Sequence, residues 1–178
     1  DIEQRALSLG VHSYTCIDAV KSYYDSCVKY LIYGNVLKTN TYPLSVSAER
    51  TIQAKSIADY AKKINADAVS HGSTGAGNDQ VRFDVIFNIL CPNIEIITPI
   101  RDLKLSREAE IEFLKENQVE MNFEKALYSV NKGLWGTSVG GKETLTSNQY
   151  LPETAFPSQL EKTEADKTEV ILHFKQGE

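Results

Sequence analysis

The stretch Ser70-His71-Gly72-Ser73-Thr74-Gly75-Ala76-Gly77-Asn78-Asp79-Gln80-Val81-Arg82-Phe83 decides the fold of the surrounding chain. A short run of small and β-branched residues, 66–69, precedes it and is typical of a strand. Residues 79–90 begin inside this stretch and continue beyond it. They carry Val81, Val85 and Ile89 at spacings of four, which predicts a helix with these three residues on one face. In an open α/β sheet, such a glycine-rich strand-to-helix turn lies at the carboxyl ends of the strands, where ligands bind.

The elements on either side extend this pattern. The β-branched run 94–98 reads as a buried parallel strand, and Ser106 can cap a charged helix to about residue 117. Upstream we expect a strand over 11–17, a helix from the cap Asp18 to about residue 33, and a second helix from Ser45 or Ser47 to about residue 64, with a core face of Ile57, Tyr60, Ala61 and Ile64. This order predicts the α/β class, with an open, mainly parallel, doubly wound sheet.

The character of the chain changes after Gln118. Two further strands are expected, over 126–130 and 170–174, separated by a long segment rich in Gly, Thr, Ser and Pro. We therefore predict one domain over 1–117 and the beginning of a second, β-containing domain over 118–178.

Composition narrows the function. The 178 residues are 42% hydrophobic and 24% charged, as in ordinary globular proteins. The net charge of −5 makes a nucleic-acid partner unexpected. We find neither an apolar run long enough to span a bilayer nor a signal-peptide pattern at the start, so no membrane partner and a cytoplasmic location are expected. No metal-ligand spacing stands out, and the three cysteines lack a CxxC pair.

The glycine turn carries a polar constellation that suits small anions. Unpaired amides at a helix N-terminus attract carboxylate or phosphate. Asn78 and Arg82 are four apart, so an amide lies beside a guanidinium that can pair with both oxygens of a carboxylate. Two alternatives stay open: Asp79 can be only a helix cap with Arg82 on the surface, and His71 can be a structural, hydrogen-bonded residue rather than a phosphate contact.

Known phosphate motifs do not account for this turn. Gly72 to Gly77 has the first Walker spacing, but Asn78 and Asp79 replace the Lys-Ser pair. The dinucleotide pattern fails at Gln80, where a third small residue belongs.

The loop from His71 to Phe83 closely resembles that of the argininosuccinate synthase family. Two more stretches, 40–50 (Asn-Thr-Tyr-Pro-Leu-Ser-Val-Ser-Ala-Glu-Arg) and 128–138 (Tyr-Ser-Val-Asn-Lys-Gly-Leu-Trp-Gly-Thr-Ser), resemble the same family in the same order. The resemblance covers essentially the whole chain. It implies an adenine nucleotide alpha hydrolase-like domain of the ATP pyrophosphatase type, followed by the start of an α+β synthetase domain.

The resemblance also implies an activity. Members of this family are ligases that join citrulline to aspartate through a citrullyl-adenylate, using ATP with Mg²⁺ and releasing AMP and pyrophosphate, in arginine biosynthesis or the urea cycle. A cytoplasmic homotetramer is implied for the full-length protein.

The family's site residues transfer to this chain by motif. The ATP contacts would be His71, Gly72, Ser73, Gly75 and Gly77, and the aspartate contacts Thr74, Asn78 and Asp79. The citrulline contacts would be Tyr42, Ser47, Asn78, Arg82, Ser129 and Ser138. Asp79 and Arg82 would be the catalytic pair, with no resident metal.

Two departures from the family qualify these expectations. Ala76 stands where many members have Lys, which removes a possible phosphate contact. The family's Ser-Gly-Gly-Leu-Asp-Thr-Ser pyrophosphate loop and its C-terminal part are also not found in these 178 residues. We therefore expect a fragment that is inactive alone. The alternatives are another ATP pyrophosphatase-type adenylating enzyme, or a non-catalytic nucleotide- or amino-acid-binding module.

Overall fold

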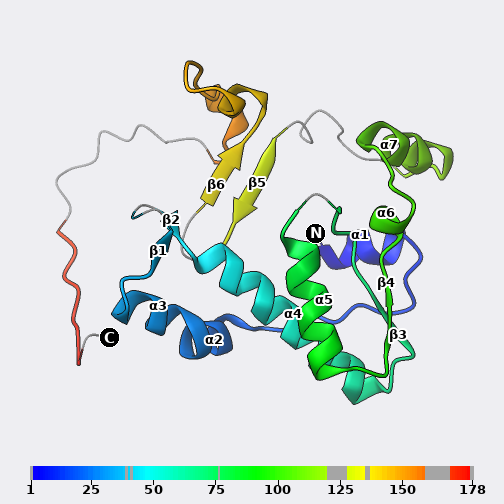
Figure 1. Cartoon of the computed structure of the whole chain (residues 1–178), viewed down its shortest axis with the longest axis horizontal. Helices are drawn as coiled ribbons and strands as arrows, with labels where there is room; N and C mark the ends of the chain where they lie inside the picture. Colours follow the sequence, from blue (N-terminus) through cyan, green and yellow to red (C-terminus); the bar gives the residue numbers. More distant parts are fainter. Residues whose placement is uncertain are drawn as a thin grey trace.

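The centre of the fold is a strand-helix-strand unit. The computed structural model describes residues 2–38, 40, 42–75, 77–119, 128–134, 137–158 and 169–176. In it, β3 (Ala68–Ser70), α5 (Asp79–Leu90) and β4 (Glu95–Ile97) follow one another, and β3 pairs with β4 in parallel, Val69 opposite Ile96. The predicted parallel strands and the helix between them are confirmed (Figure 1).

The longest helix, α4 (Ser45–Ile64), packs against α5 through a row of alanines. Ala54, Ala58 and Ala61 are buried and cluster with Val69 and Phe87. Small side chains let the two helices approach closely, so the core lies between them.

Part of the predicted face of α4 was wrong. Ala61 is buried and Tyr60 half-buried, but Ile57 and Ile64 are 38% and 54% exposed. Ser45 is the first helical residue, and the N-cap position belongs to Leu44, which makes no side-chain capping bond. The prediction gave weight to large apolar residues, whereas the buried contact with α5 is made by the row of alanines.

The face shared by Val81, Val85 and Ile89 on α5 is exposed, at 56%, 49% and 67%. The opposite side of the helix carries Phe87 into the core. Ile97 of β4 is also 43% exposed, so the expectation that this strand is buried was wrong for the described residues. The parallel sheet of the described residues has two strands, β3 and β4.

The helix predicted from Asp18 to Tyr33 is present with a wide turn inside it. It runs through α2 (Val20–Tyr23), a π-helical turn η1 (Tyr24–Val28) and α3 (Lys29–Tyr33). Asp18 Oδ1 accepts from the backbone N–H of Val20 at 3.0 Å, but the N-cap position belongs to Ala19, so the predicted cap is one residue too early. Because the π turn holds an extra residue, the two buried positions, Tyr23 and Val28, are five apart, whereas Val20 is exposed.

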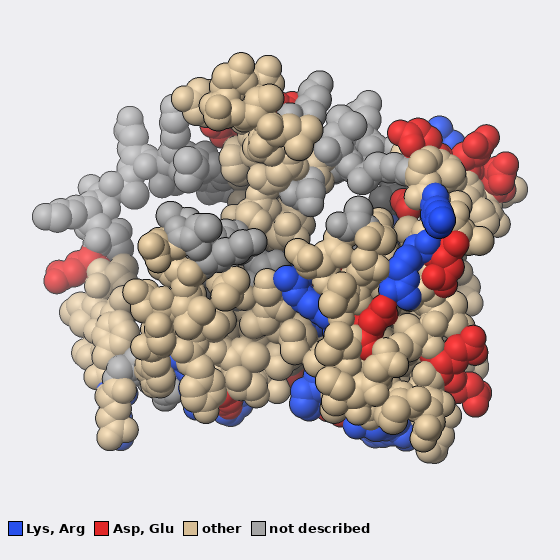
Figure 2. All heavy atoms as spheres, in the orientation of Figure 1, with Lys and Arg blue, Asp and Glu red and all other residues tan. Residues whose placement is uncertain are grey.

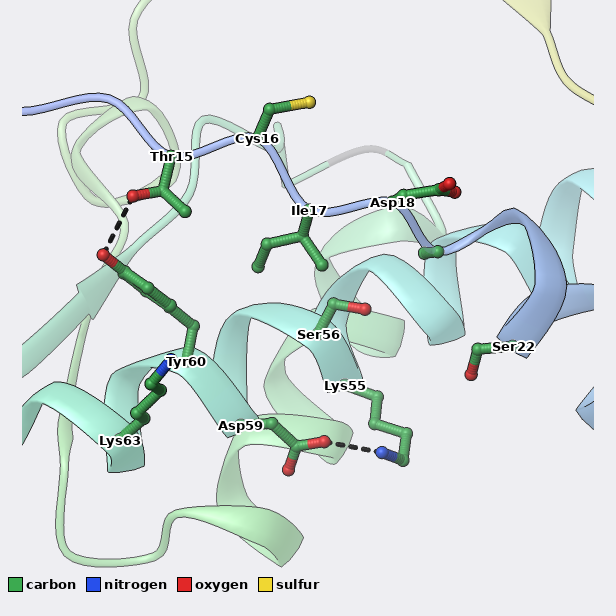
Figure 3. Close-up of a pocket in the computed structure, with 11 residues that line it drawn as sticks. Thr15, Cys16, Ile17, Asp18, Ser22, Lys55, Ser56, Asp59, Tyr60 and Lys63 are labelled. Atoms are coloured by element: carbon green, nitrogen blue, oxygen red, sulfur yellow. Dashed lines mark hydrogen bonds and ion pairs between the residues drawn. The ribbon is translucent and has the colours of Figure 1, made fainter.

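The strand predicted over 11–17 was wrong, because these residues have no ladder partner among the described strands. The segment instead runs in an irregular conformation beside α4, where the Thr15 Oγ1 and Tyr60 hydroxyl oxygens lie 2.9 Å apart (Figure 3). A groove of about 550 Å³ lies between the two, lined in part by Cys16, Lys55 and Asp59.

Several short elements surround this unit. Ser106 caps α7 (Arg107–Glu116) as predicted, accepting from the Ala109 N–H at 3.2 Å. Acidic side chains gather over α7, which carries Glu108, Glu110, Glu112 and Glu116 (Figure 2). The remaining short elements in this part are α1 (Ile2–Ser8), β1 (Leu37–Lys38), β2 (Tyr42–Pro43) and α6 (Pro99–Asp102).

Beyond residue 127 the structure contains an antiparallel hairpin of β5 (Ser129–Lys132) and β6 (Thr137–Gly140). Short 3-10 turns follow at η3 (Lys142–Leu145) and η4 (Glu153–Ala155). The strand predicted over 126–130 is shifted toward the C-terminus, and residues 126 and 127 lie outside the described part. The strand predicted over 170–174 was wrong, because this segment has no regular structure and pairs with no described strand.

Within the described residues, none of the helices combines the length and the apolar character needed to cross a bilayer.

Candidate functional site

The glycine loop leaves the carboxyl end of β3 and enters α5, as its sequence predicts. The backbone N–H of His71 donates to the Ile97 carbonyl at 3.2 Å, so the loop begins beside the end of β4. Asn78 occupies the N-cap position of α5 without a capping bond from its side chain. Asp79 is the first residue of the helix itself, so the alternative in which Asp79 serves only as the cap is wrong.

The loop glycines are not demanded by the protein's own packing. Gly72, Gly75 and Gly77 all lie outside the left-handed region, and a Cβ at each would meet its nearest atom at 3.9, 3.7 and 3.9 Å, an ordinary contact. Alanine would therefore fit at each position. Glycine there instead leaves the outer side of the loop open to a close ligand.

Arg82 links two other predicted site residues, Asp79 and Ser47. Its Nη1 donates to Asp79 Oδ1 at 2.7 Å, and its Nη2 donates to Ser47 Oγ at 2.9 Å, across the contact between α5 and α4. Arg50 on α4 donates through Nε to Asp79 Oδ2 at 3.3 Å. The Asp79 carboxylate thus lies between two guanidinium groups.

The remaining predicted citrulline contacts are less fully described. The side chains of Tyr42 and Ser129 fall outside the described part, as does Ala76. Ser138 lies on β6 opposite Asn131. The turn of this hairpin reaches α4, because a Cβ on Gly133 would lie 2.2 Å from Glu49 Oε2, two residues along the helix from Ser47.

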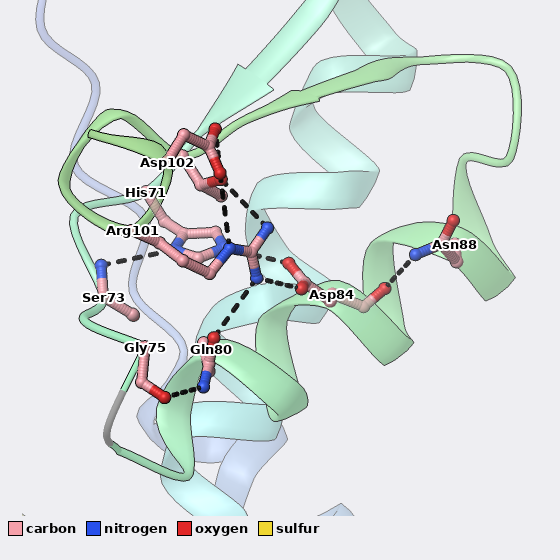
Figure 4. Close-up of polar contacts among 9 residues, drawn as sticks. His71, Ser73, Gly75, Gln80, Asp84, Asn88, Arg101 and Asp102 are labelled. Carbon is pink, nitrogen blue, oxygen red and sulfur yellow. Dashed lines mark hydrogen bonds and ion pairs between the residues drawn. The ribbon is translucent and has the colours of Figure 1, made fainter. Parts of the chain in front are cut away.

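His71 has both ring nitrogens engaged inside the protein. Nδ1 accepts from the backbone N–H of Ser73 at 3.2 Å, and Nε2 lies 3.0 Å from Asp84 Oδ1 (Figure 4). A nitrogen that accepts an N–H carries no proton, so the ring is neutral and Nε2 donates to Asp84. The side chain is 5% exposed and stacks on Phe83 with 5.3 Å between ring centroids. The structural interpretation of His71, which the sequence left open, therefore matches this geometry.

Asp84 receives a second partner from α6. The Arg101 guanidinium pairs with its other oxygen and also donates to the Thr98 hydroxyl at 2.9 Å. Burial raises the pKa of Asp84, but the hydrogen bonds from His71 and Arg101 outweigh it and hold the pKa below its usual range. Asp84 is thus an ionised acceptor between the two groups.

Sequence reasoning missed Asp84, Arg101 and Gln80 as members of this site. A signal was available, since Thr98 to Asp102 directly follow the second parallel strand, and the carboxyl ends of neighbouring parallel strands meet at one edge. Polar residues there would be expected beside the glycine loop.

Comparison with known proteins gives one consistent result. The sequence model described as the arginosuccinate synthase N-terminal HUP domain matches residues 1–120. The argininosuccinate synthase of Sulfurisphaera tokodaii is 37% identical over 177 residues, and that of Sulfolobus acidocaldarius is 38% identical over 176. That of Staphylococcus epidermidis is 38% identical over 182 aligned residues. Each alignment covers 99% of this chain and 45% of the relative, so the chain spans about half the length of these curated relatives.

Proposed function

Because the chain belongs to the argininosuccinate synthase family, we propose that its full-length gene product ligates citrulline to aspartate and splits ATP to AMP and pyrophosphate. The ureido oxygen of citrulline attacks the α-phosphate of ATP, supplied as its magnesium complex, and pyrophosphate leaves. The aspartate amine then attacks the citrullyl-adenylate and displaces AMP. We extend the proposal to a cytoplasmic homotetramer.

The observation that carries the proposal is the Arg82 bridge. The guanidinium contacts Ser47 from α4 and Asp79 from the first turn of α5, so residues 35 and 3 positions away in sequence meet at one group. Two of these residues are expected to hold citrulline and the third to hold aspartate. A site that must bring two amino acids together gains most of its acceleration from such positioning.

The proposed roles divide along the loop. The open backbone of Gly72, Gly75 and Gly77, with Ser73, faces ATP, and His71 supports this loop from inside the protein rather than contacting ATP. Thr74, Asn78 and Asp79 hold aspartate. The Asp79 carboxylate suits the aspartate ammonium, and Arg82 suits the citrulline carboxylate. Citrulline is held by Tyr42, Ser47, Asn78, Arg82, Ser129 and Ser138. The boundary near residue 118 separates a nucleotide-binding domain from the beginning of the synthetase domain.

The experiment is a pyrophosphate-release assay of the full-length gene product, omitting one substrate at a time. Release should require ATP, citrulline and aspartate together, with argininosuccinate as product. Pyrophosphate release with a different acceptor would favour another adenylating enzyme, and binding without turnover would favour a binding module.

Arg82→Ala should raise the KM for citrulline by about 100-fold, because a charge-assisted fork worth about 2–3 kcal/mol is removed. Arg82→Lys keeps the positive charge but lacks the two-pronged guanidinium, so its KM for citrulline should lie between those of the wild type and Arg82→Ala. Exposed Lys62 on α4 supplies the control variant Lys62→Ala, for which KM should stay unchanged. An unchanged KM in Arg82→Ala would remove Arg82 from the site.

A further inference from the structure

We propose that Asp84 and Arg101 are positioning residues that fix the shape of the first part of the glycine loop, residues 71–75, and through it the binding of ATP. The inference rests on the function proposed above. Neither residue belongs to the predicted contacts, and both act on the loop through other side chains.

The beginning of the loop is held through His71. Its Nδ1 accepts the Ser73 N–H at 3.2 Å, which bends the chain directly after β3. This bond requires the proton to be on Nε2, and Asp84 Oδ1, 3.0 Å from Nε2, favours that tautomer. A carboxylate at position 84 therefore sets the hydrogen bond that shapes the first turn of the loop.

The middle of the loop is held through Gln80. Its Nε2 donates to the Gly75 carbonyl at 2.6 Å, and its Oε1 accepts from Arg101 Nη1 at 3.4 Å. The aliphatic part of Arg101 also lies against the loop, since a Cβ on Gly75 would be 3.7 Å from Arg101 Cγ. Arg101 thus orients the amide that holds Gly75 and closes the space beneath it (Figure 4).

The contacts through His71 and through Gln80 both lead to the Asp84–Arg101 pair, and this pair is hydrogen-bonded to the residue that follows β4. Arg101 Nη2 donates to the hydroxyl of Thr98, which is 1% exposed at the end of β4 and donates in turn to Asp102 at 2.8 Å. Isolated exposed ion pairs contribute little to stability because water and salt screen them. The side chains of Arg101 and Asp84 are only 29% and 27% exposed, and they make several directional hydrogen bonds. The geometry of this pair is therefore better defined than that of an isolated surface pair.

The pair is separate from the contacts proposed for citrulline. Arg82 turns toward Ser47 on α4, whereas Asp84 and Gln80 turn toward α6. Among the described residues, no hydrogen bond joins the Asp84–Arg101 pair to Arg82, Asp79 or Ser47. Loss of the pair should therefore weaken ATP binding selectively.

The test measures KM for ATP and for citrulline in the full-length gene product. Arg101→Met should raise the KM for ATP about tenfold and change that for citrulline by less than about twofold. Arg101→Lys keeps the charge facing Asp84 and should recover part of the loss. Lys55→Met breaks the exposed Lys55–Asp59 pair on α4 and is the matched control, with both KM values unchanged. Equal rises in both KM values, or none, would overturn the assignment.

A second measurement does not depend on catalysis. Nitrogen-15 NMR of the histidine side chains should show His71 as the Nε2–H tautomer. Backbone amide exchange at Ser73 should quicken about tenfold in Arg101→Met and in Asp84→Asn, but not in Lys55→Met. If the wild-type protein forms no argininosuccinate, the proposed function fails while this measurement still decides the positioning role. Unchanged Ser73 exchange in both variants would reject it.

Discussion

At Gly72, the packing of the folded protein and the proposed binding of ATP place different steric requirements on one residue. Its backbone lies outside the left-handed region, and a Cβ would meet Ile100 Cγ1 at 3.9 Å without a clash. The folded protein thus has space for alanine at this position, and only the proposed contact with ATP would require glycine.

Gly72→Ala should therefore leave stability unchanged or raise it by up to about 1 kcal/mol, because alanine restricts the unfolded chain. The affinity for ATP should fall about tenfold, equivalent to ~1.4 kcal/mol. Urea unfolding and calorimetric titration of the full-length gene product measure the two effects. A matched loss of stability and affinity would show instead that the glycine serves packing.

At the scale of elements, the contact between α4 and α5 depends on small side chains. Ala58 is fully buried in the middle of this contact. Because α4 carries Ser47 and α5 carries Arg82, the separation of the helices also sets the bridge between these two residues.

Ala58→Leu should lower the free energy of unfolding by about 1–3 kcal/mol, because three added carbon atoms have no space in a close-packed contact. Lys63→Leu, on the exposed side of the same helix, should change it by less than about 0.5 kcal/mol. Denaturant unfolding of both variants gives the comparison. Equal stability of Ala58→Leu and the wild type would mean that the helices are less tightly packed than described.

Elements with strong local signals could be predicted, and those that depend on partners could not. Ser106 as a cap, the helices after Asp18 and Gly77, and the parallel strands around α5 all follow from short-range patterns. The strands expected over 11–17 and 170–174 need a neighbour that alternating side chains cannot reveal. A strand exists only through its ladder bonds.

The candidate site divides in the same way. Asn78 and Arg82 could be anticipated because they lie four apart in the first helical turns after a glycine loop, whereas the role of Asp79 came from the family resemblance. The order of the strands indicates that residues after β4 lie beside the loop, but it does not show which side chains pair. Arg101 and His71 are 30 positions apart, and both contact Asp84 only in the folded structure.

On the scale of the whole molecule, apolar side chains are concentrated on the surface near the C-terminus. Val170, Ile171, Leu172 and Phe174 are 74%, 69%, 71% and 72% exposed. The extended segment that carries them runs apart from the helices, at the opposite side of Figure 1 from α7. Contiguous exposed apolar residues of this kind favour association.

The 178-residue chain should therefore form oligomers as its concentration rises. Ile171→Lys combined with Phe174→Lys should shift this association to at least about tenfold higher concentration, because the charges oppose burial of the segment. Light scattering across a dilution series measures the change. Val130→Lys, at a 41% exposed position on β5, is the control. An identical shift in this variant would mean that any added surface charge opposes association, and that the segment 170–174 has no special part in it.

The π turn at Tyr24–Val28 has a consequence for evolution within the family. Tyr23 and Val28 reach the same interior patch across five positions, and an ordinary α-helix would bring them there across four. A sequence lacking one residue in this interval, such as solvent-facing Ser26, would keep both anchors in place and simply tighten the coil. We therefore expect that family members can lack one residue between these two positions without losing the buried contacts of the helix.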